Sequence, residues 1–192
     1  MELFALRGYG GTGIALIART AGVLPGSIHH FFATKEDLAA AVLQKRLELL
    51  EPVVLEPIFA RIDDPIERVF GLLDGYRTML GLTKFEHGCP IGNLALELAE
   101  SHPNLRALIG ANFEKWWQAV TQCFREASDR FPPDTDPERL GIFTLTTMEG
   151  AVMLARIFRN YDAFDAAVVS LRETIELLLA AGGDWSAPRS GP

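Results

Sequence analysis

The cysteine and histidine side chains are the residues of this chain best suited to chemistry, and their spacing does not indicate catalysis. Cys89 and Cys123 are too few for a disulfide framework, and no cysteine or histidine cluster has metal-ligand spacing. The order of serine, histidine and aspartate matches no catalytic triad, and no strand precedes the glycines at 8–11 to make a nucleotide loop. We therefore predict that the protein is not an enzyme and binds no metal, and no cofactor is indicated.

Cys89 leaves two interpretations open. It lies between Gly88 and Pro90 at the start of a predicted helix, where the helix dipole can lower the pKa of a thiol and make it reactive. Such a thiol could sense electrophiles or oxidants. The alternative is that Cys89 is a small buried apolar residue.

The stretch from Thr12 to Lys35 predicts two short helices joined by a tight turn. Thr12 is placed to cap the first helix, and Gly22 can end it in a left-handed conformation. Apolar residues at helical spacing give each helix one inward face: Ile14, Ile17 and Ala18 in the first, and Ile28, Phe31 and Phe32 in the second. Two short helices with this connection form a helix-turn-helix, which is too small to be stable alone.

The rest of the chain predicts further helices and no strand. A capping box at Thr34–Asp37 starts a long helix that Pro52 and Pro57 end or bend. Asp64 and Pro65 start another. The later helices are predicted over 91–100, from Pro103 to about 130, over 137–159, and over 163–181, where Gly182 and Gly183 end the last one before a frayed tail over 186–192. With a short helix at 2–7, the fold class is all-α, with about nine helices.

Composition and charge divide the chain into two parts. The 192 residues are 48% hydrophobic and carry a net charge of −7, as in an ordinary globular protein. Residues 1–46 hold five basic and three acidic side chains, a net charge of +2, and the remainder carries −9. We predict a mildly basic head over 1–46 and an acidic body over 47–192. No apolar run or signal segment indicates a membrane, so we expect a cytoplasmic protein.

Three segments of the head resemble the TetR family of bacterial transcriptional regulators. They are L-F-A-L-R-G-Y-G-G-T (3–12), I-A-R-T-A-G-V (17–23) and G-S-I-H-H-F-F-A-T-K-E-D-L (26–38). The body is more weakly similar to the ligand-binding half of one branch of the family, at 88–98, at 148–156 and in the tryptophan-bearing helix. The resemblance implies a homodimer whose heads bind operator DNA and whose bodies bind a small molecule.

The same resemblance implies which residues would contact DNA. A recognition helix in the major groove presents side chains to base edges, and a two-fold dimer requires a palindromic operator. Carried over by position, the DNA-facing residues are Thr12, Gly13, Leu24, Pro25, Ser27, His29, His30 and Lys35.

The head also departs from the family pattern. That pattern begins further upstream, so the first helix here looks truncated, and Ala15, Leu16, Leu24, Pro25 and His29 replace residues that are usually polar or tyrosine. Two functions therefore stay open. One is a ligand-responsive regulator, a repressor released from its operator by a small apolar or aromatic molecule. The other is a dimeric small-molecule-binding protein with weakened or lost DNA binding.

Aromatic and methionine side chains of the body predict a ligand cavity, with ordinary core packing as the alternative. The candidate wall residues are Tyr76, Met79, Phe85, Phe113, Trp116, Trp117, Phe143 and Met148. The candidate polar anchors are His87, Asn93, Asn112 and Glu149.

The last two helices are the predicted dimer interface, because both carry apolar residues on more than one face. Gly150, Ala151 and Ala155 would allow close approach of a second helix, either from a partner subunit or from within the same chain.

Overall fold

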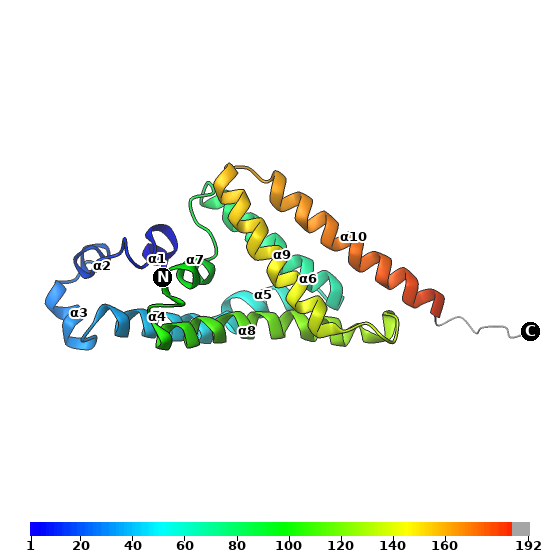
Figure 1. The fold of residues 1–192 in the computed structure, drawn as a ribbon, viewed down its shortest axis with the longest axis horizontal. Helices are drawn as coiled ribbons and strands as arrows, with labels where there is room; N and C mark the ends of the chain where they lie inside the picture. Colours follow the sequence, from blue (N-terminus) through cyan, green and yellow to red (C-terminus); the bar gives the residue numbers. More distant parts are fainter. Residues whose placement is uncertain (186–192) are drawn as a thin grey trace, which may run out of the picture.

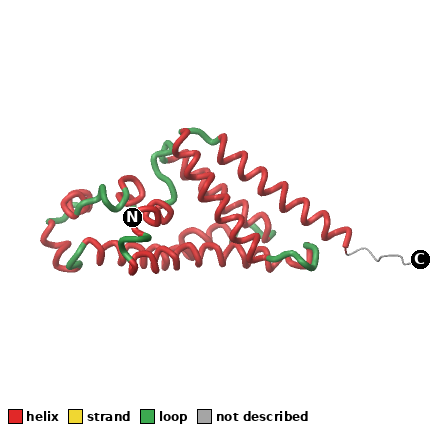
Figure 2. The backbone as a smooth tube through the Cα atoms, in the orientation of Figure 1, coloured by secondary structure: helices red, strands yellow, loops and turns green. Residues whose placement is uncertain are grey.

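The computed structural model describes residues 1–185, and this range is helical with no strand (Figures 1 and 2). Short helices come first, and the longest helices, α6, α8, α9 and α10, belong to the body. The α-helices are α1 (Glu2–Arg7), α2 (Ile14–Ala21), α3 (Pro25–Phe31), α4 (Lys35–Leu49), α5 (Glu56–Phe59), α6 (Pro65–Leu82), α7 (Pro90–Leu98), α8 (Pro103–Glu126), α9 (Pro137–Phe158) and α10 (Asp162–Trp185). A π-helical segment over Leu50–Leu55 joins α4 to α5, and a 3₁₀ turn over Ser128–Arg130 follows α8.

The molecule is elongated, with the three short helices α1–α3 at one end (Figure 1). Helices α4 and α8 pack along each other and connect that end to the body. Helix α9 packs between α8 and α10, and α7 lies beside α1. The all-α architecture predicted from sequence is therefore confirmed, with a small helix-turn-helix head beside a larger helical body.

Several local signals in the sequence produce the expected helix ends. Gly22 adopts the left-handed conformation at φ 68° and ends α2. The hydroxyl of Thr34 accepts a hydrogen bond from the Asp37 N–H at 3.1 Å, and the Asp37 carboxylate accepts one from the Thr34 N–H at 2.9 Å. This capping box starts α4 as predicted. The Asp64 carboxylate caps α6 by accepting bonds from two backbone N–H groups of its first turn.

Three predictions about local structure are wrong. Thr12 does not cap α2, which begins after Gly13; its side chain is fully buried and its hydroxyl donates to the Gly8 carbonyl at 2.7 Å. Phe31 does not face inward but is 77% exposed. Gly182 does not end α10, which continues to Trp185. A Cβ at Gly182 would overlap the Arg130 carbonyl, so the glycine allows close packing of the helix there. The predicted frayed tail over 186–192 lies outside the described residues.

Pro52 and Pro57 change the helix geometry without ending the helical run. Proline has no N–H to donate within a helix, and the backbone between Leu50 and Leu55 widens into π-helical geometry before α5 begins. The regular α-helix therefore ends at Leu49, and the helical run goes on to Phe59.

One core runs through both parts of the molecule. Its members are buried apolar residues contributed by α1, α4 and α6–α10 and by the segments between them, among them Phe4, Ala39, Leu43, Leu73, Leu94, Leu105, Val120, Phe124, Phe164 and Ile175. Ala151 and Ala155 are 2% and 0% exposed in this core, so these two residues serve packing within the chain. The intramolecular alternative therefore holds for both alanines.

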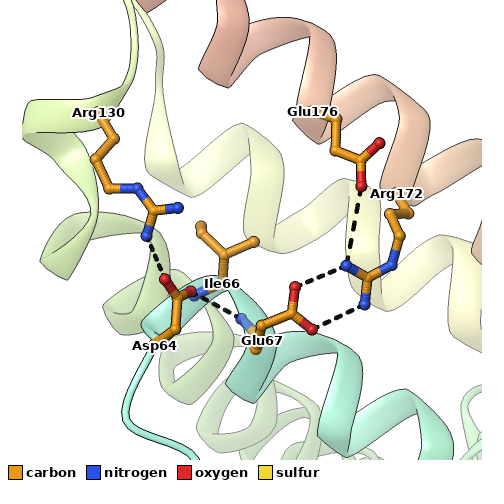
Figure 3. Close-up of polar contacts among 6 residues, drawn as sticks. All are labelled: Asp64, Ile66, Glu67, Arg130, Arg172 and Glu176. Carbon is orange, nitrogen blue, oxygen red and sulfur yellow. Dashed lines mark hydrogen bonds and ion pairs between the residues drawn. The ribbon is translucent and has the colours of Figure 1, made fainter. Parts of the chain in front are cut away.

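Ion pairs connect α6 to the helices that come later in the chain (Figure 3). The Arg172 guanidinium on α10 binds the Glu67 carboxylate on α6 with two hydrogen bonds of 2.7 and 3.0 Å. Arg130 binds the Asp64 carboxylate at 2.7 Å. The pairing with Arg172 lowers the pKa of Glu67. Because these pairs are partly exposed, each contributes little to the free energy of unfolding, and their main effect is to orient α6 relative to α10 and to the turn at Arg130.

Helix α9 is, among the described residues, the one helix long and apolar enough to cross a membrane by length and composition. Its most apolar window has a mean hydropathy of 1.3, and 39% of that window is buried by neighbouring helices. A core helix of a globular domain gives the same values, so the apolar character of α9 is weak evidence for a membrane span.

The close packing of α9 on α8 at Gly141 can be tested by mutation. A Cβ at Gly141 would overlap the buried Thr121 side chain and the Trp117 ring. We expect Gly141→Ala to lower the free energy of unfolding by about 1–3 kcal/mol, because overpacking forces the two helices apart. Gly110→Ala, on the exposed side of α8 with open space around it, is the matched control and should raise that free energy by up to about 1 kcal/mol. Equal effects in urea unfolding would contradict this packing account.

Candidate DNA-binding surface and ligand cavity

Helix α3 presents nearly all of its side chains to solvent. Ile28 is 7% exposed and anchors the helix to the head, whereas Pro25, Ser27, His29 and His30 are exposed. The sequence of α3 contains histidine and serine hydrogen-bonding groups but no lysine, arginine or carboxylate. This surface can therefore offer hydrogen bonds and apolar contacts to base edges, with few charges for phosphates.

The other predicted DNA-facing residues have different surroundings. Gly13 is exposed at the start of α2, and Leu24 before α3 is 76% exposed. The Lys35 ammonium donates to the Tyr9 carbonyl at 3.0 Å and lies 4.0 Å from the centre of the Tyr9 ring. The expected contact of the Thr12 side chain with DNA does not fit this structure, because that side chain is buried and its hydroxyl is bonded within the head. Phe31 was predicted to face inward, but its exposed side chain belongs to this surface.

The head is tied to the body through α7. The Glu97 carboxylate on α7 accepts hydrogen bonds from the backbone N–H groups of Tyr9 at 3.1 Å and Gly10 at 2.8 Å. The Asn93 amide, also on α7, donates to the Ala5 carbonyl of α1 at 2.8 Å. Helix α1 and the loop that follows it are therefore held against α7 by hydrogen bonds. Asn93, predicted as a ligand anchor, serves this junction.

An outer cavity of about 490 Å³ lies where the head meets the body. Its walls come from α1, α4, the π-helical segment, α5, α6 and the loop before α7. The residues lining it are Glu2, Ala5, Arg46, Val53, Val54, Pro57, Ile58, Arg61, Leu72, Gly75, Tyr76, Met79, His87, Gly88 and Pro90. The size and the largely apolar lining suit a small organic molecule.

A smaller inner cavity of about 20 Å³ lies in the body, and Tyr76 and Arg46 line both cavities. Five helices contribute to it. Its lining residues are Arg46, Leu50, Tyr76, Cys89, Ile91, Asn112, Phe113, Trp116, Leu145, Met148 and Glu149. The Tyr76 and Trp116 rings meet edge to face there, with centroids 6.2 Å apart.

Five of the eight aromatic and methionine residues predicted to line a ligand site therefore border one of these two cavities: Tyr76, Met79, Phe113, Trp116 and Met148. The other three lie elsewhere. Phe85 packs on Tyr161 with ring centroids 4.8 Å apart, Trp117 lies against Gly141, and Phe143 is 43% exposed on α9. Arg46 and the π-helical valines were missed, because no sequence signal shows which face of α4 and its extension meets α6.

Burial dominates the chemistry of the inner cavity. It raises the pKa of Glu149, and burial together with the nearby Glu149 carboxyl raises the pKa of the Cys89 thiol. Burial also raises the pKa of the Tyr76 phenol. The hypothesis of a reactive Cys89 with a lowered pKa is therefore wrong: the helix dipole is outweighed by the loss of solvent. Cys89 is the small buried residue of the alternative interpretation.

Among residues 1–185, no group of three histidine, cysteine, aspartate or glutamate side chains could hold a metal ion.

Comparison with known proteins identifies the class to which this arrangement belongs. Residues 1–42 match the model for bacterial regulatory proteins of the tetR family, and residues 65–171 match the model for the tetracyclin repressor-like C-terminal domain. The second match alone covers more than half of the chain. The protein therefore belongs to the TetR family of DNA-binding transcriptional regulators.

Individual relatives agree over nearly the whole length. The transcriptional repressor DhaR of Mycobacterium sp. (strain GP1) is 26% identical over 176 residues, which cover 91% of this chain and 87% of the relative. The crystal structure of a regulatory protein TetR from Rhodobacter sphaeroides superposes with a TM-score of 0.81 at 25% identity, covering 88% of this chain and 91% of that chain. A cysteine mutant of the TetR-family regulator CifR, solved with a 26-base-pair operator, has the same fold with a TM-score of 0.74 at 21% identity, covering 88% and 90%.

The buried carboxyl of Glu149 predicts how stability depends on pH. Its raised pKa means that the folded state keeps a proton that the unfolded chain has already released. Stability associated with this group is complete below the ordinary glutamate pKa and is lost as pH rises through the folded value. Glu149→Gln should therefore gain stability relative to the unmodified protein as pH rises from 4 to 8, by about 1.4 kcal/mol for each unit of pKa shift.

This pH dependence is measured by urea unfolding at one protein concentration across the pH range. Glu114→Gln, at an exposed position of α8, is the control and should follow the unmodified protein throughout. Parallel profiles for Glu149→Gln and the unmodified protein would show that the Glu149 carboxyl ionises as freely in the folded state as in the unfolded chain.

Proposed function

We propose that the protein is a homodimeric repressor that binds a palindromic operator and is released by a small apolar or aromatic molecule. The observation that carries this proposal is the position of the outer cavity, whose walls come from the head through Ala5 and Arg46 and from the body through Tyr76 and Met79. A molecule that fills it contacts both parts at once. A ligand with different affinities for two arrangements of the heads would shift the dimer between them.

The expected DNA contacts are the exposed groups of α3 and its flanks, namely Gly13, Leu24, Pro25, Ser27, His29 and His30, together with the partly buried Lys35. The repressor name of DhaR and the operator bound to CifR support this assignment by similarity. The protein would be active where DNA is, in the cytoplasm.

The proposal is tested by selecting operators from random DNA with the purified protein and repeating the binding in the presence of apolar and aromatic metabolites. We expect a palindromic site and weaker binding with at least one metabolite. Selection of no sequence at low salt would contradict DNA recognition.

The histidines of α3 give a sharper test of the same surface. His29→Ala combined with His30→Ala should weaken binding to the selected operator by at least about ten-fold, because each contact to a base edge contributes about 1–3 kcal/mol. Gln118→Ala, on the exposed face of α8, is the control and should leave binding unchanged. Fluorescence anisotropy of labelled operator measures both affinities. Unchanged binding of the double variant would remove the histidines from the interface.

A second function is favoured by one observation. The surface beside and on α3 exposes Leu24 at 76% and Phe31 at 77%, and α3 carries no lysine or arginine. A chain with this surface could bind a small molecule as a dimer while its affinity for DNA is weak. Ligand binding without operator selection would favour this alternative.

The dimer interface is proposed on α9 and α10. Large apolar side chains are exposed on both helices: Ile142, Phe143, Met153, Leu154, Ile157, Phe158, Val169 and Leu177. A monomer rarely exposes so much apolar surface on two adjacent helices, and pairing with a second copy would bury it.

We expect Ile157→Asp to convert the dimer to monomer, because a charge would be buried in an apolar interface. Ile157 is 70% exposed, so the single chain should tolerate the change. Leu96→Asp is the matched control: Leu96 is 84% exposed on α7 and should leave the dimer intact. Light scattering after size-exclusion chromatography gives both masses. A dimeric Ile157→Asp protein would place the interface elsewhere.

A further inference from the structure

Two residues that line the inner cavity each carry a polar atom with no hydrogen-bond partner among the described residues. These atoms are Nε1 of Trp116 and Oε1 of Glu149, and both atoms are buried. The Trp116 side chain is 4% exposed, and it borders the cavity together with Glu149. Leaving such a group unpaired in the interior is unfavourable, because its hydrogen bond to water is lost and not replaced. The cavity therefore presents a donor and a carboxyl group that a bound molecule could satisfy.

The size of the inner cavity limits what can enter it. A cavity of about 20 Å³ exceeds the roughly 10–15 Å³ needed to hold one water-sized group. A single hydroxyl oxygen has about the size that this space takes. The rest of a ligand has to lie outside the inner cavity.

The outer cavity supplies that space. Tyr76 and Arg46 border both cavities, so the Tyr76 side chain stands between them. Beyond Tyr76 the walls are largely apolar, with Val54, Ile58 and Met79 among them. A ligand whose oxygen reached the inner cavity would place its hydrocarbon part against these residues once the Tyr76 side chain rotated aside.

Charge at the site favours an uncharged ligand. The Arg46 side chain borders the same space and would repel a cationic group. Burial raises the pKa of the Glu149 carboxyl, so the cavity favours the uncharged form of this group more than water does. Tyr76 borders both cavities, so its aromatic ring can pack against a ring that carries the oxygen.

We propose that the inner cavity is a polar subsite for a phenol-type molecule, whose hydroxyl oxygen accepts a hydrogen bond from Trp116 Nε1 and bonds to the Glu149 carboxyl. The ring then extends past Tyr76 into the outer cavity. This inference rests on the proposed function, because it names the chemical class of the effector that the cavities would bind.

The subsite is tested by calorimetric titration of the full chain with three compounds of nearly equal size. They are p-cresol, p-xylene, which replaces the hydroxyl with a methyl group, and 4-methylbenzylamine, which is cationic at neutral pH. We expect p-cresol to bind at least about ten-fold more tightly than p-xylene, as one satisfied buried hydrogen-bonding group allows. Equal binding of p-cresol and p-xylene, tighter binding of the amine, or no binding of p-cresol would overturn the proposal.

Two tryptophan variants locate the effect. Trp116→Phe removes the unpaired N–H while keeping an aromatic ring, and it should abolish the preference for p-cresol over p-xylene. Trp117→Phe is the matched control, because Trp117 also has an unpartnered Nε1 in the described structure but lies against Gly141, away from the cavity. Retention of the preference in Trp116→Phe, or its loss in Trp117→Phe, would overturn the assignment.

Operator binding separates this inference from the proposed function. If p-cresol binds with the expected dependence on Trp116 but does not release the selected operator, the subsite stands and the ligand-responsive function fails. If other apolar molecules release the operator while p-cresol does not bind, the function stands and the phenol subsite fails.

Discussion

The packing of α4 along α8 is the contact on which the rest of the structure depends. Leu43 of α4 is completely buried, and the buried Asn112 amide of α8 donates to its carbonyl at 3.1 Å. The three helices before α4 are too short to bury a core of their own, so their stability depends on α4, which joins them to the body, and on α7, which binds α1 and the loop after it. The same packing lets one cavity border both parts, since Arg46 lies one turn beyond Leu43. The predicted anchor Asn112 is therefore a structural amide that fixes the head to the body.

Local structure in this chain could be predicted wherever one residue type determines a backbone conformation. Gly22 at its left-handed turn, the Thr34 capping box and the Asp64 cap act over a few residues, so their sequence patterns are sufficient. Predictions failed where tertiary contacts decide. Thr12 is buried and bonded within the head, and Gly182 lies inside α10, where its missing side chain leaves room for the Arg130 carbonyl. Spacing alone does not reveal such contacts.

The sequence predicted which kinds of side chain line the candidate ligand site, but not which individual residues border the cavities. Apolar periodicity places Tyr76, Phe113, Trp116 and Met148 on inward faces, and these residues do meet at the inner cavity. The same periodicity also included Trp117, which faces Gly141 instead. Adjacent residues on a helix differ by about 100° in direction, so only the packing of α8 decides which tryptophan borders a cavity. The raised pKa of Cys89 has a similar origin, because burial by α9 outweighs the local effect of the helix start.

The link between Glu97 and the first loop of the head also constrains how this sequence can vary. The carboxylate binds main-chain N–H groups of Tyr9 and Gly10, so it is indifferent to the side chains at those two positions. At Gly10 an added Cβ would lie 3.6 Å from the Glu97 carboxylate, an ordinary contact. Gly8 differs, because its φ is 69° and an added Cβ would overlap that carboxylate. In related sequences that keep this link, we expect other residues at the position of Gly10. Glycine at position 8 and the acidic residue at position 97 should occur together.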